Sequence, residues 1–225
     1  MLLLYRTLGG RSLRQVSLVC LSVAVMGVSY GISAHAAGIP LWANLLLATT
    51  VLAGASEFLF IASMHEGVLP VVAALAGILV NARNLIYGFA VSPSIGPGWR
   101  RWVGAHLVND ESVALSSAEA SEQRRRLLYW VTGIGVLVAW PFGAVLGGTL
   151  GALIADPSAF GFDAVLPAVL LAVVMPALRD NWTRGIALLG ALLACGVTPW
   201  VPVGVAPILS LVALPLVLLQ RKDST

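Results

Sequence analysis

Residues 53–92 read AGASEFLFIASMHEGVLPVVAALAGILVNARNLIYGFAVS, and this stretch decides the class of the fold. It is apolar enough to lie in a bilayer, yet its hydrophobic runs contain Glu57, Asn81, Arg83 and Asn84. Polar and ionisable groups at membrane depth are costly, so they persist mainly where they pair, line a wet cavity or contact a substrate. The stretch therefore predicts the working centre of a membrane transporter.

The rest of the chain has the same apolar character. Hydrophobic residues make up 59% of the 225 residues and charged residues 10%, and the mean hydropathy is +0.93. A soluble domain carries about 25% charged residues, whereas a membrane-crossing helix needs about 20 apolar residues. We therefore predict an all-α, polytopic membrane helix bundle of about seven or eight transmembrane segments, some of them broken or re-entrant, in a single transport domain.

The positive charges are informative through their location. The net charge is +3, but in a membrane chain Lys and Arg retain loops in the cytoplasm, so we predict no nucleic-acid partner. We expect a basic cytoplasmic N-terminus at 1–15, the helix bundle at 16–219 and a cytoplasmic tail at 220–225. Alternatively, the first apolar run, 16–32, with the small residues at 34–36, resembles a secretory signal.

Eight crossings place most cationic loops on the cytoplasmic side. The expected segments are 16–32, 41–64, 68–91, 102–117, 127–154, 164–178, 186–197 and 202–219. This count leaves Arg100 and Arg101 outside, against the positive-inside rule. Either 41–64 or 102–117 is therefore expected to be re-entrant or broken, and interrupted segments of this kind mark the substrate sites of transporters.

The candidate substrate site combines a predicted helix break with a polar helix face. A zwitterionic amino acid needs donors for its carboxylate, acceptors for its ammonium group and an apolar pocket for its side chain. Three features offer these groups. They are the backbone at the predicted break over 53–57, the carboxyl group of Glu57, and the small and polar helix face formed by Gly77, Asn81, Asn84 and Gly88. The predicted substrate-binding residues are Gly54, Ala55, Ser56, Glu57, Asn81, Arg83, Asn84 and Tyr87.

Arg83 has two interpretations. It either binds the substrate carboxylate or forms a structural pair with Glu57, Asp110 or Glu111, because a buried cation needs a counter-charge. Glu57, Arg83, His106, Asp110 and Glu111 are thus the candidates for ion coupling or pairing. His106 and Asp110 share one face of an uninterrupted helix over 102–117.

Other chemistry has little support in the sequence. Cys20 and Cys195 offer no metal-ligand spacing, and we predict neither a metal nor a cofactor. An intramembrane hydrolase using Ser56 and His106 is an alternative, although the Gly-x-Ser-x-Gly and His-Glu-x-x-His motifs are missing. A non-transporting assembly or sensor subunit is the other alternative, and we predict that the protein is not an enzyme.

Four motifs then resemble the landmarks of the AzlC family. They are AGASEF at 53–58, LVNARNLIYG at 79–88, NDES at 109–112 and GFDAVLPA at 161–168 followed by LRD at 178–180. The resemblance covers roughly 18–217. It implies the large subunit of a bacterial branched-chain amino acid exporter, which works with a small hydrophobic AzlD-type membrane subunit and also moves methionine, driven by the proton motive force.

Three positions depart from the family pattern. Glu57 stands where many members carry Gln, Asn84 where His is common, and Asn109 where Thr or another residue precedes the acidic pair. The change from His to Asn removes a group that titrates near neutral pH. A proton relay through position 84 is therefore weakened, which leaves Glu57 as the candidate for the substrate ammonium group or the transported proton.

Overall fold

The computed structural model describes residues 2–153 and 177–201, together with positions 171, 175, 209 and 213. Within these residues all regular elements are helical. Four helices are long and apolar enough to cross a membrane, namely Thr7–Ala36, Pro70–Ile95, Glu122–Gly151 and Asn181–Trp200. The all-α membrane bundle is thus confirmed. The predicted segments 164–178 and 202–219, and the tail 220–225, lie largely or wholly outside the described residues.

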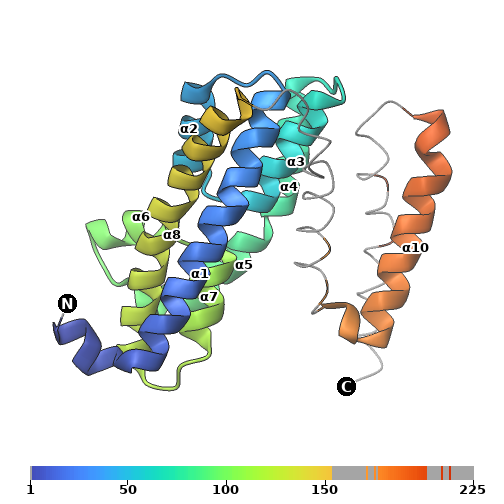
Figure 1. Cartoon of the computed structure of the whole chain (residues 1–225). Coiled ribbons are helices and arrows are strands. Elements are labelled where there is room, and N and C mark those ends of the chain that lie inside the picture. The colour runs from blue at the N-terminus through green and yellow to red at the C-terminus, as the bar shows by residue number, and fades with distance from the viewer. Residues whose placement is uncertain are drawn as a thin grey trace.

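Helices α1 (Leu2–Ala36) and α8 (Glu122–Gly151) pack along each other through glycines (Figure 1). A Cβ atom at Gly27 would lie 2.8 Å from the Trp140 carbonyl oxygen. One at Gly31 or Gly147 would overlap the backbone of the facing helix. Small residues let two backbones approach this closely in a membrane. In the sequence, the glycines at 143, 147, 148 and 151 indicate close helix packing by their spacing, and the structure confirms it.

Helix α1 starts much earlier than the predicted segment 16–32. The basic stretch 1–15 is largely helical, with a bend at Gly9, where φ is +75° and ψ is 161°. Glycine has no Cβ atom, so it adopts this backbone conformation without steric strain. The N-terminal part of the helix therefore changes direction at Gly9 before the helix continues along α8.

Residues 41–65 form a hairpin of two short helices. Helix α2 (Leu41–Thr50) ends at a break over 51–53, where Leu52 has a φ of +49°, and α3 (Gly54–His65) then runs back (Figure 1). Asn44 donates from Nδ2 to the Ala144 carbonyl oxygen of α8 at 3.0 Å, which fixes α2 to that helix. The predicted break in 41–64 is confirmed, and the segment is a hairpin with both ends at the same end of the bundle.

The next long span is interrupted once. Helices α4 (Pro70–Asn81) and α5 (Arg83–Ile95) follow each other with a turn at Ala82. On one ideal helix Arg83 would point away from Asn81, so the sequence required either a partner for Arg83 or an interruption between Val80 and Asn84. The structure has an interruption there. Helix α4 packs on α3, and α5 continues toward the opposite end of the bundle (Figure 1).

A second hairpin enters from that opposite end. Helix α6 (Trp99–His106) stops at Leu107, and α7 (Asp110–Ser117) begins after Asn109, whose side chain caps the new helix by accepting from Ser112 N at 2.8 Å. The alternative of a broken 102–117 segment is confirmed, because this cap starts a second helix, and the expectation that His106 and Asp110 share one uninterrupted helix was wrong. His106 and Asp110 consequently lie on different helices and share no face.

The two hairpins touch at their tips. His106 Nε2 lies 2.8 Å from the Thr49 carbonyl oxygen at the end of α2. Because α2 and α3 return to the end from which they came, the α4–α5 span finishes at the end where α1 begins. Arg100 and Arg101 therefore lie at the same end as Arg124–Arg126, which corrects the eight-crossing count.

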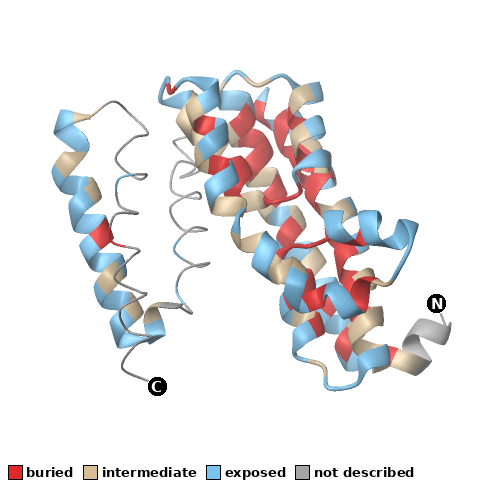
Figure 2. Cartoon of the chain, turned by 180° about the vertical axis from the view of Figure 1, so that it is seen from behind, coloured by how far each residue is buried: buried red, intermediate tan, exposed pale blue. Residues whose placement is uncertain are grey.

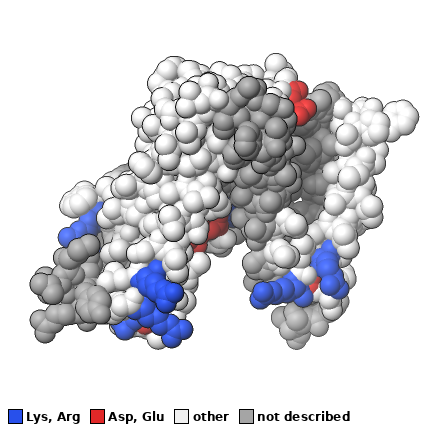
Figure 3. All heavy atoms as spheres, in the orientation of Figure 1, with Lys and Arg blue, Asp and Glu red and all other residues white. Residues whose placement is uncertain are grey.

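Most of the described arginines lie toward this end (Figure 3), whereas Arg83 pairs with Asp110 at the break between α4 and α5. The end contains the starts of α1, α6 and α8, and in Figure 1 also the start of α10 (Asn181–Val197), which follows Arg179. Loops rich in Lys and Arg remain in the cytoplasm. The positive-inside rule therefore indicates that the arginine-rich end faces the cytoplasm.

The packed core lies where α1, α3 and α8 meet, whereas α10 is mostly exposed (Figure 2). Tyr30 of α1 stacks on Trp140 of α8 with ring centroids 5.1 Å apart, and Phe58 of α3 meets Tyr30 edge-on at 5.4 Å. Such aromatic pairs add to the stabilisation that burial provides. The core thus fixes the first hairpin to the α1–α8 pair.

Candidate functional site

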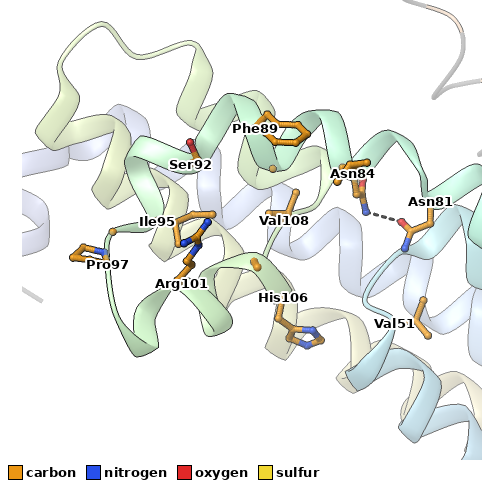
Figure 4. A pocket seen from close by; sticks show the side chains of 14 residues that line it. Val51, Asn81, Asn84, Phe89, Ser92, Ile95, Pro97, Arg101, His106 and Val108 are labelled. Atoms are coloured by element: carbon orange, nitrogen blue, oxygen red, sulfur yellow. Dashed lines mark hydrogen bonds between the residues drawn. The ribbon is translucent and has the colours of Figure 1, made fainter.

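A cavity of about 610 Å³ runs beside α5 and α6 (Figure 4). Its volume is in the range of small-molecule sites, about 300–1,000 Å³. It reaches from the break in the first hairpin to the loop between α5 and α6. The lining residues are Val51, Asn81, Asn84, Leu85, Gly88, Phe89, Ser92, Ile95, Gly96, Pro97, Arg101, Ala105, His106 and Val108.

The inner end of the cavity is polar. Asn84 donates from Nδ2 to Asn81 Oδ1 at 2.6 Å, so the two amides act as a pair (Figure 4). Asn84 Oδ1 is buried and has no hydrogen-bond partner within the described part of the chain. A buried acceptor without a donor costs about 1–3 kcal/mol. The inner end of the cavity therefore has an amide pair in which one acceptor lacks a donor among the described residues.

The wall of the cavity is mainly apolar. Leu85 and Phe89 on α5 contribute to it, together with Ile95 and Val108. Gly88 also lines the cavity, and a Cβ atom there would meet nothing within 4 Å. The wall is thus suited to a compact hydrocarbon side chain, and Gly88 leaves room for it.

The outer end of the cavity is cationic. Arg101 lines it near the α5–α6 loop and has no carboxylate partner among the described residues. His106 lines the cavity too, while its Nε2 atom faces the Thr49 carbonyl oxygen. Arg101 is not among the site residues predicted from the sequence. The sequence did contain a signal for Arg101, because the eight-crossing count placed Arg100 and Arg101 outside, against the positive-inside rule.

Arg83 forms an ion pair and does not line the cavity. Its Nη2 atom lies 2.6 Å from Asp110 Oδ2, with the two side chains 25% and 38% exposed. Of the three acids considered as partners, the structure thus selects Asp110. The pair links the start of α5 to the start of α7, which supports the structural interpretation of Arg83.

Glu57 lies in the packed junction of α3 and α8. It is 2% exposed, and it accepts from Ala53 N at 2.9 Å and from Trp140 Nε1 at 3.2 Å. Gly54 lies against the Trp140 ring, and Ala55 is buried. The predicted site residues 54–57 are therefore together, but they are outside the lining of the cavity.

The remaining candidates are dispersed. The Ser56 hydroxyl donates to the Ala53 carbonyl oxygen at 2.8 Å, so both Ser56 and His106 contact backbone carbonyls instead of each other. Tyr87 packs against a separate apolar cluster, and Glu111 has no ion-pair partner among the described residues. In the same residues no cluster of His, Cys, Asp and Glu has the arrangement of a metal site.

Comparison with known proteins identifies the family. The model of the family described as "AzlC protein" matches residues 18–154. The "Branched-chain amino acid transport protein AzlC" of Bacillus subtilis is 24% identical over 163 residues, which are 71% of this chain and 62% of that protein. The chain therefore covers less than two thirds of this relative.

Two other relatives have names without a function. An "Uncharacterized membrane protein" of Haemophilus influenzae is 24% identical over 76% of this chain and 70% of its own length. One from Helicobacter pylori is 24% identical over 78% of each chain. No solved structure matches the chain. Because the family model covers more than half of the sequence, the chain is a multi-pass membrane transport protein and belongs to the AzlC family.

Proposed function

We propose that the protein is the large subunit of a two-component secondary transporter in the bacterial cytoplasmic membrane. It exports leucine, isoleucine and valine, and also methionine, with a small hydrophobic AzlD-type subunit as its partner. The proton motive force drives the export. The cavity beside α5 is the observation that carries this proposal, because it combines an amide pair, an apolar wall and a cationic mouth. The name of the Bacillus relative supports the substrate class.

The chemistry of the cavity suits a zwitterion with an aliphatic side chain. The unpartnered Asn84 Oδ1 accepts from the ammonium group, and Leu85 and Phe89 contact the side chain. Arg101 attracts the carboxylate at the mouth, since opposite charges steer a ligand into a low-dielectric cleft. Arg83 remains in its pair with Asp110 and holds the helix starts in place.

The position of the cavity fits loading from the cytoplasm. Its mouth lies at Gly96 and Pro97, at the end that the arginines assign to the cytoplasm, and its inner part reaches Val51 and His106 near the contact between the hairpin tips. In this proposal, the tips separate to release the substrate on the other side. Glu57 remains the candidate for the transported proton, because it is a buried acid at the break of the first hairpin.

The test is efflux from cells preloaded with labelled leucine or methionine. The chain is expressed alone, with its small partner, or not at all, and we expect faster efflux only with both subunits. Replacing Asn84 by Leu should abolish most of this efflux while leaving folded protein in the membrane. Asn181→Ala is the matched control, because Asn181 is an exposed asparagine at the start of α10 that pairs with Arg184.

Two results would contradict the proposal. If confirmed insertion of both subunits gave no efflux of any branched-chain amino acid, the assembly or sensor alternative would replace it. If Asn84→Leu and Asn181→Ala retained equal efflux, transport would not use this cavity.

A further inference from the structure

A second cavity, of about 520 Å³, lies at the arginine-rich end of the bundle. It is formed by the beginnings of three helices, α1, α6 and α8. The lining residues are Thr7, Trp99, Arg100, Gln123, Arg126, Leu127, Trp130 and Ile134. None of them lines the cavity beside α5, so the two cavities have separate walls.

One face of α8 gives this cavity a gradient of polarity. The residues of α8 that line the cavity follow one another at intervals of three, one, three and four positions, so they lie on one side of the helix. They are Gln123, Arg126, Leu127, Trp130 and Ile134. The face is polar and cationic at its start, and apolar from Leu127 onward. Since α8 begins at the cytoplasmic end, this change follows the direction from the headgroup region toward the hydrocarbon core.

The two arginines of the cavity differ from their neighbours. Arg124 pairs with Glu119 at 3.0 Å, and Arg125 donates to the Glu119 carbonyl oxygen at 3.1 Å. Arg100 and Arg126 have no carboxylate partner within the described residues. Their positive charges are therefore available to an anion from outside the chain.

Packing holds both guanidinium groups near the cavity. The Arg126 guanidinium occupies the space that a Cβ atom at Gly96 would need. The Arg100 guanidinium carbon lies 6.0 Å from the centre of the Trp99 ring, a cation–π arrangement. Trp130 is fixed as well, because its Nε1 donates to the Ser94 carbonyl oxygen at 3.2 Å. The cavity thus has two tryptophan rings, of which Trp130 is fixed by a hydrogen bond, and two cations without a carboxylate partner among the described residues.

We propose that this cavity binds an anionic glycerophospholipid of the cytoplasmic leaflet. The phosphate lies between Arg100 and Arg126, and an acyl chain follows Leu127, Trp130 and Ile134. Basic pockets on the cytoplasmic side of membrane proteins bind anionic headgroups in this way. A soluble phosphate ion has the same charge chemistry, but it leaves the apolar half of the cavity without a ligand.

The experiment measures lipid binding to the purified protein in detergent by native mass spectrometry. Phosphatidylglycerol is compared with phosphatidylcholine of the same acyl chains. We expect the wild-type protein to retain phosphatidylglycerol preferentially and the variant Arg100→Gln/Arg126→Gln to bind it about thirtyfold more weakly. The matched control is Arg11→Gln/Arg14→Gln, which removes the same charge from exposed positions that do not line the cavity.

Three outcomes would overturn the proposal. Equal binding of both lipids by the wild-type protein is the first, and equal loss of phosphatidylglycerol in the two double variants is the second. Displacement of the lipid by millimolar inorganic phosphate is the third, because it would indicate a soluble-anion site. If the double variant does not fold, the exposed Arg100→Gln replacement alone must still weaken binding, and an unchanged affinity would contradict the site.

Discussion

The α1–α8 pair and the hairpin side of the bundle differ in how their helices are built. The pair consists of two long helices whose glycines bring the backbones into contact. The hairpin side consists of short helices with breaks at 51–53, Ala82 and 107–109. Its connections include the Arg83–Asp110 ion pair and the contact of His106 with Thr49. The first region is suited to be a fixed frame, and the second to move and to bind.

Two glycine replacements provide the largest test of this difference. In Gly147→Ala the new methyl group would overlap the Val28 backbone, which has no side-chain freedom to move aside. We expect a loss of more than about 3 kcal/mol in stability, seen as little folded protein in the membrane. In Gly88→Ala the methyl group meets no atom within 4 Å. This variant should fold normally but export leucine about tenfold more slowly, because the methyl group enters the cavity.

The comparison fails if both glycine variants have the same phenotype. Equal abundance and equal thermal stability would show that the α1–α8 contact is loose. Normal export by Gly88→Ala would show that the cavity wall at α5 does not contact the substrate.

The next largest effect concerns the junction between the two regions. Glu57→Ala leaves two buried N–H donors, on Ala53 and Trp140, without their acceptor. We expect a loss of about 2–5 kcal/mol, measured as thermal unfolding of the purified protein. Glu57→Gln retains one carbonyl oxygen and should lose less. If Glu57 carries the proton, Glu57→Gln also changes the pH dependence of export, and an unaltered pH profile would remove that role.

The Arg83–Asp110 pair should have a smaller effect. We expect Arg83→Ala and Asp110→Ala each to lower the amount of folded protein, with a coupling on the order of 1 kcal/mol in a double-mutant cycle. The coupling is modest because both side chains are partly exposed. Additive losses would show that the pair is not structural. Normal abundance with lost transport in Arg83→Ala would instead favour direct contact with substrate.

The smallest effect is expected at the start of α10. Asp180 accepts from Thr183 N and from Thr183 Oγ1, each at 2.7 Å, and these bonds lower the pKa of the carboxyl group below its ordinary value. A lowered pKa means that the cap stabilises the helix at neutral pH and that this stabilisation is lost as the pH falls through the acidic range. The protection of the Thr183 amide, measured as its hydrogen-exchange rate relative to the intrinsic rate at each pH, should therefore decrease below about pH 4.

Asp180→Asn is the control for this last measurement, because asparagine caps a helix without titrating in this range. The exchange of its Thr183 amide should not show the acidic transition. The same transition in both proteins would assign it to another group.

The sequence alone was sufficient for the helical class and for the helix breaks at 51–53 and Ala82, but not for the bend at Gly9. The helix breaks near 53–57 and 80–84 were indicated by small or polar residues inside apolar runs. The glycine spacing in 127–154 predicted close packing, but the partner helix could not be known, because α1 is far away in the sequence. The family resemblance was confirmed over 18–154.

The composition of the site was harder to predict. Asn81 and Asn84 line the cavity, but Glu57 turns toward Trp140 of α8, and helical periodicity cannot reveal a partner on another helix. The sequence left three acids, Glu57, Asp110 and Glu111, as possible partners of Arg83, and only the fold of α7 selects Asp110. Arg101 was missed because counting 41–64 as a full crossing placed the loop before residue 102 on the other side of the membrane, whereas 41–65 is a hairpin.

The partnership of α1 and α8 also sets the timing of biogenesis. About 85 residues separate the end of α1 from the start of α8. A ribosome adds roughly 5–20 residues per second, so α1 waits on the order of 4–17 seconds in the membrane before its partner emerges. During this time its glycine face is open to lipids and to other newly made helices. The insertion machinery, or a chaperone beside it, would have to protect that face until α8 arrives.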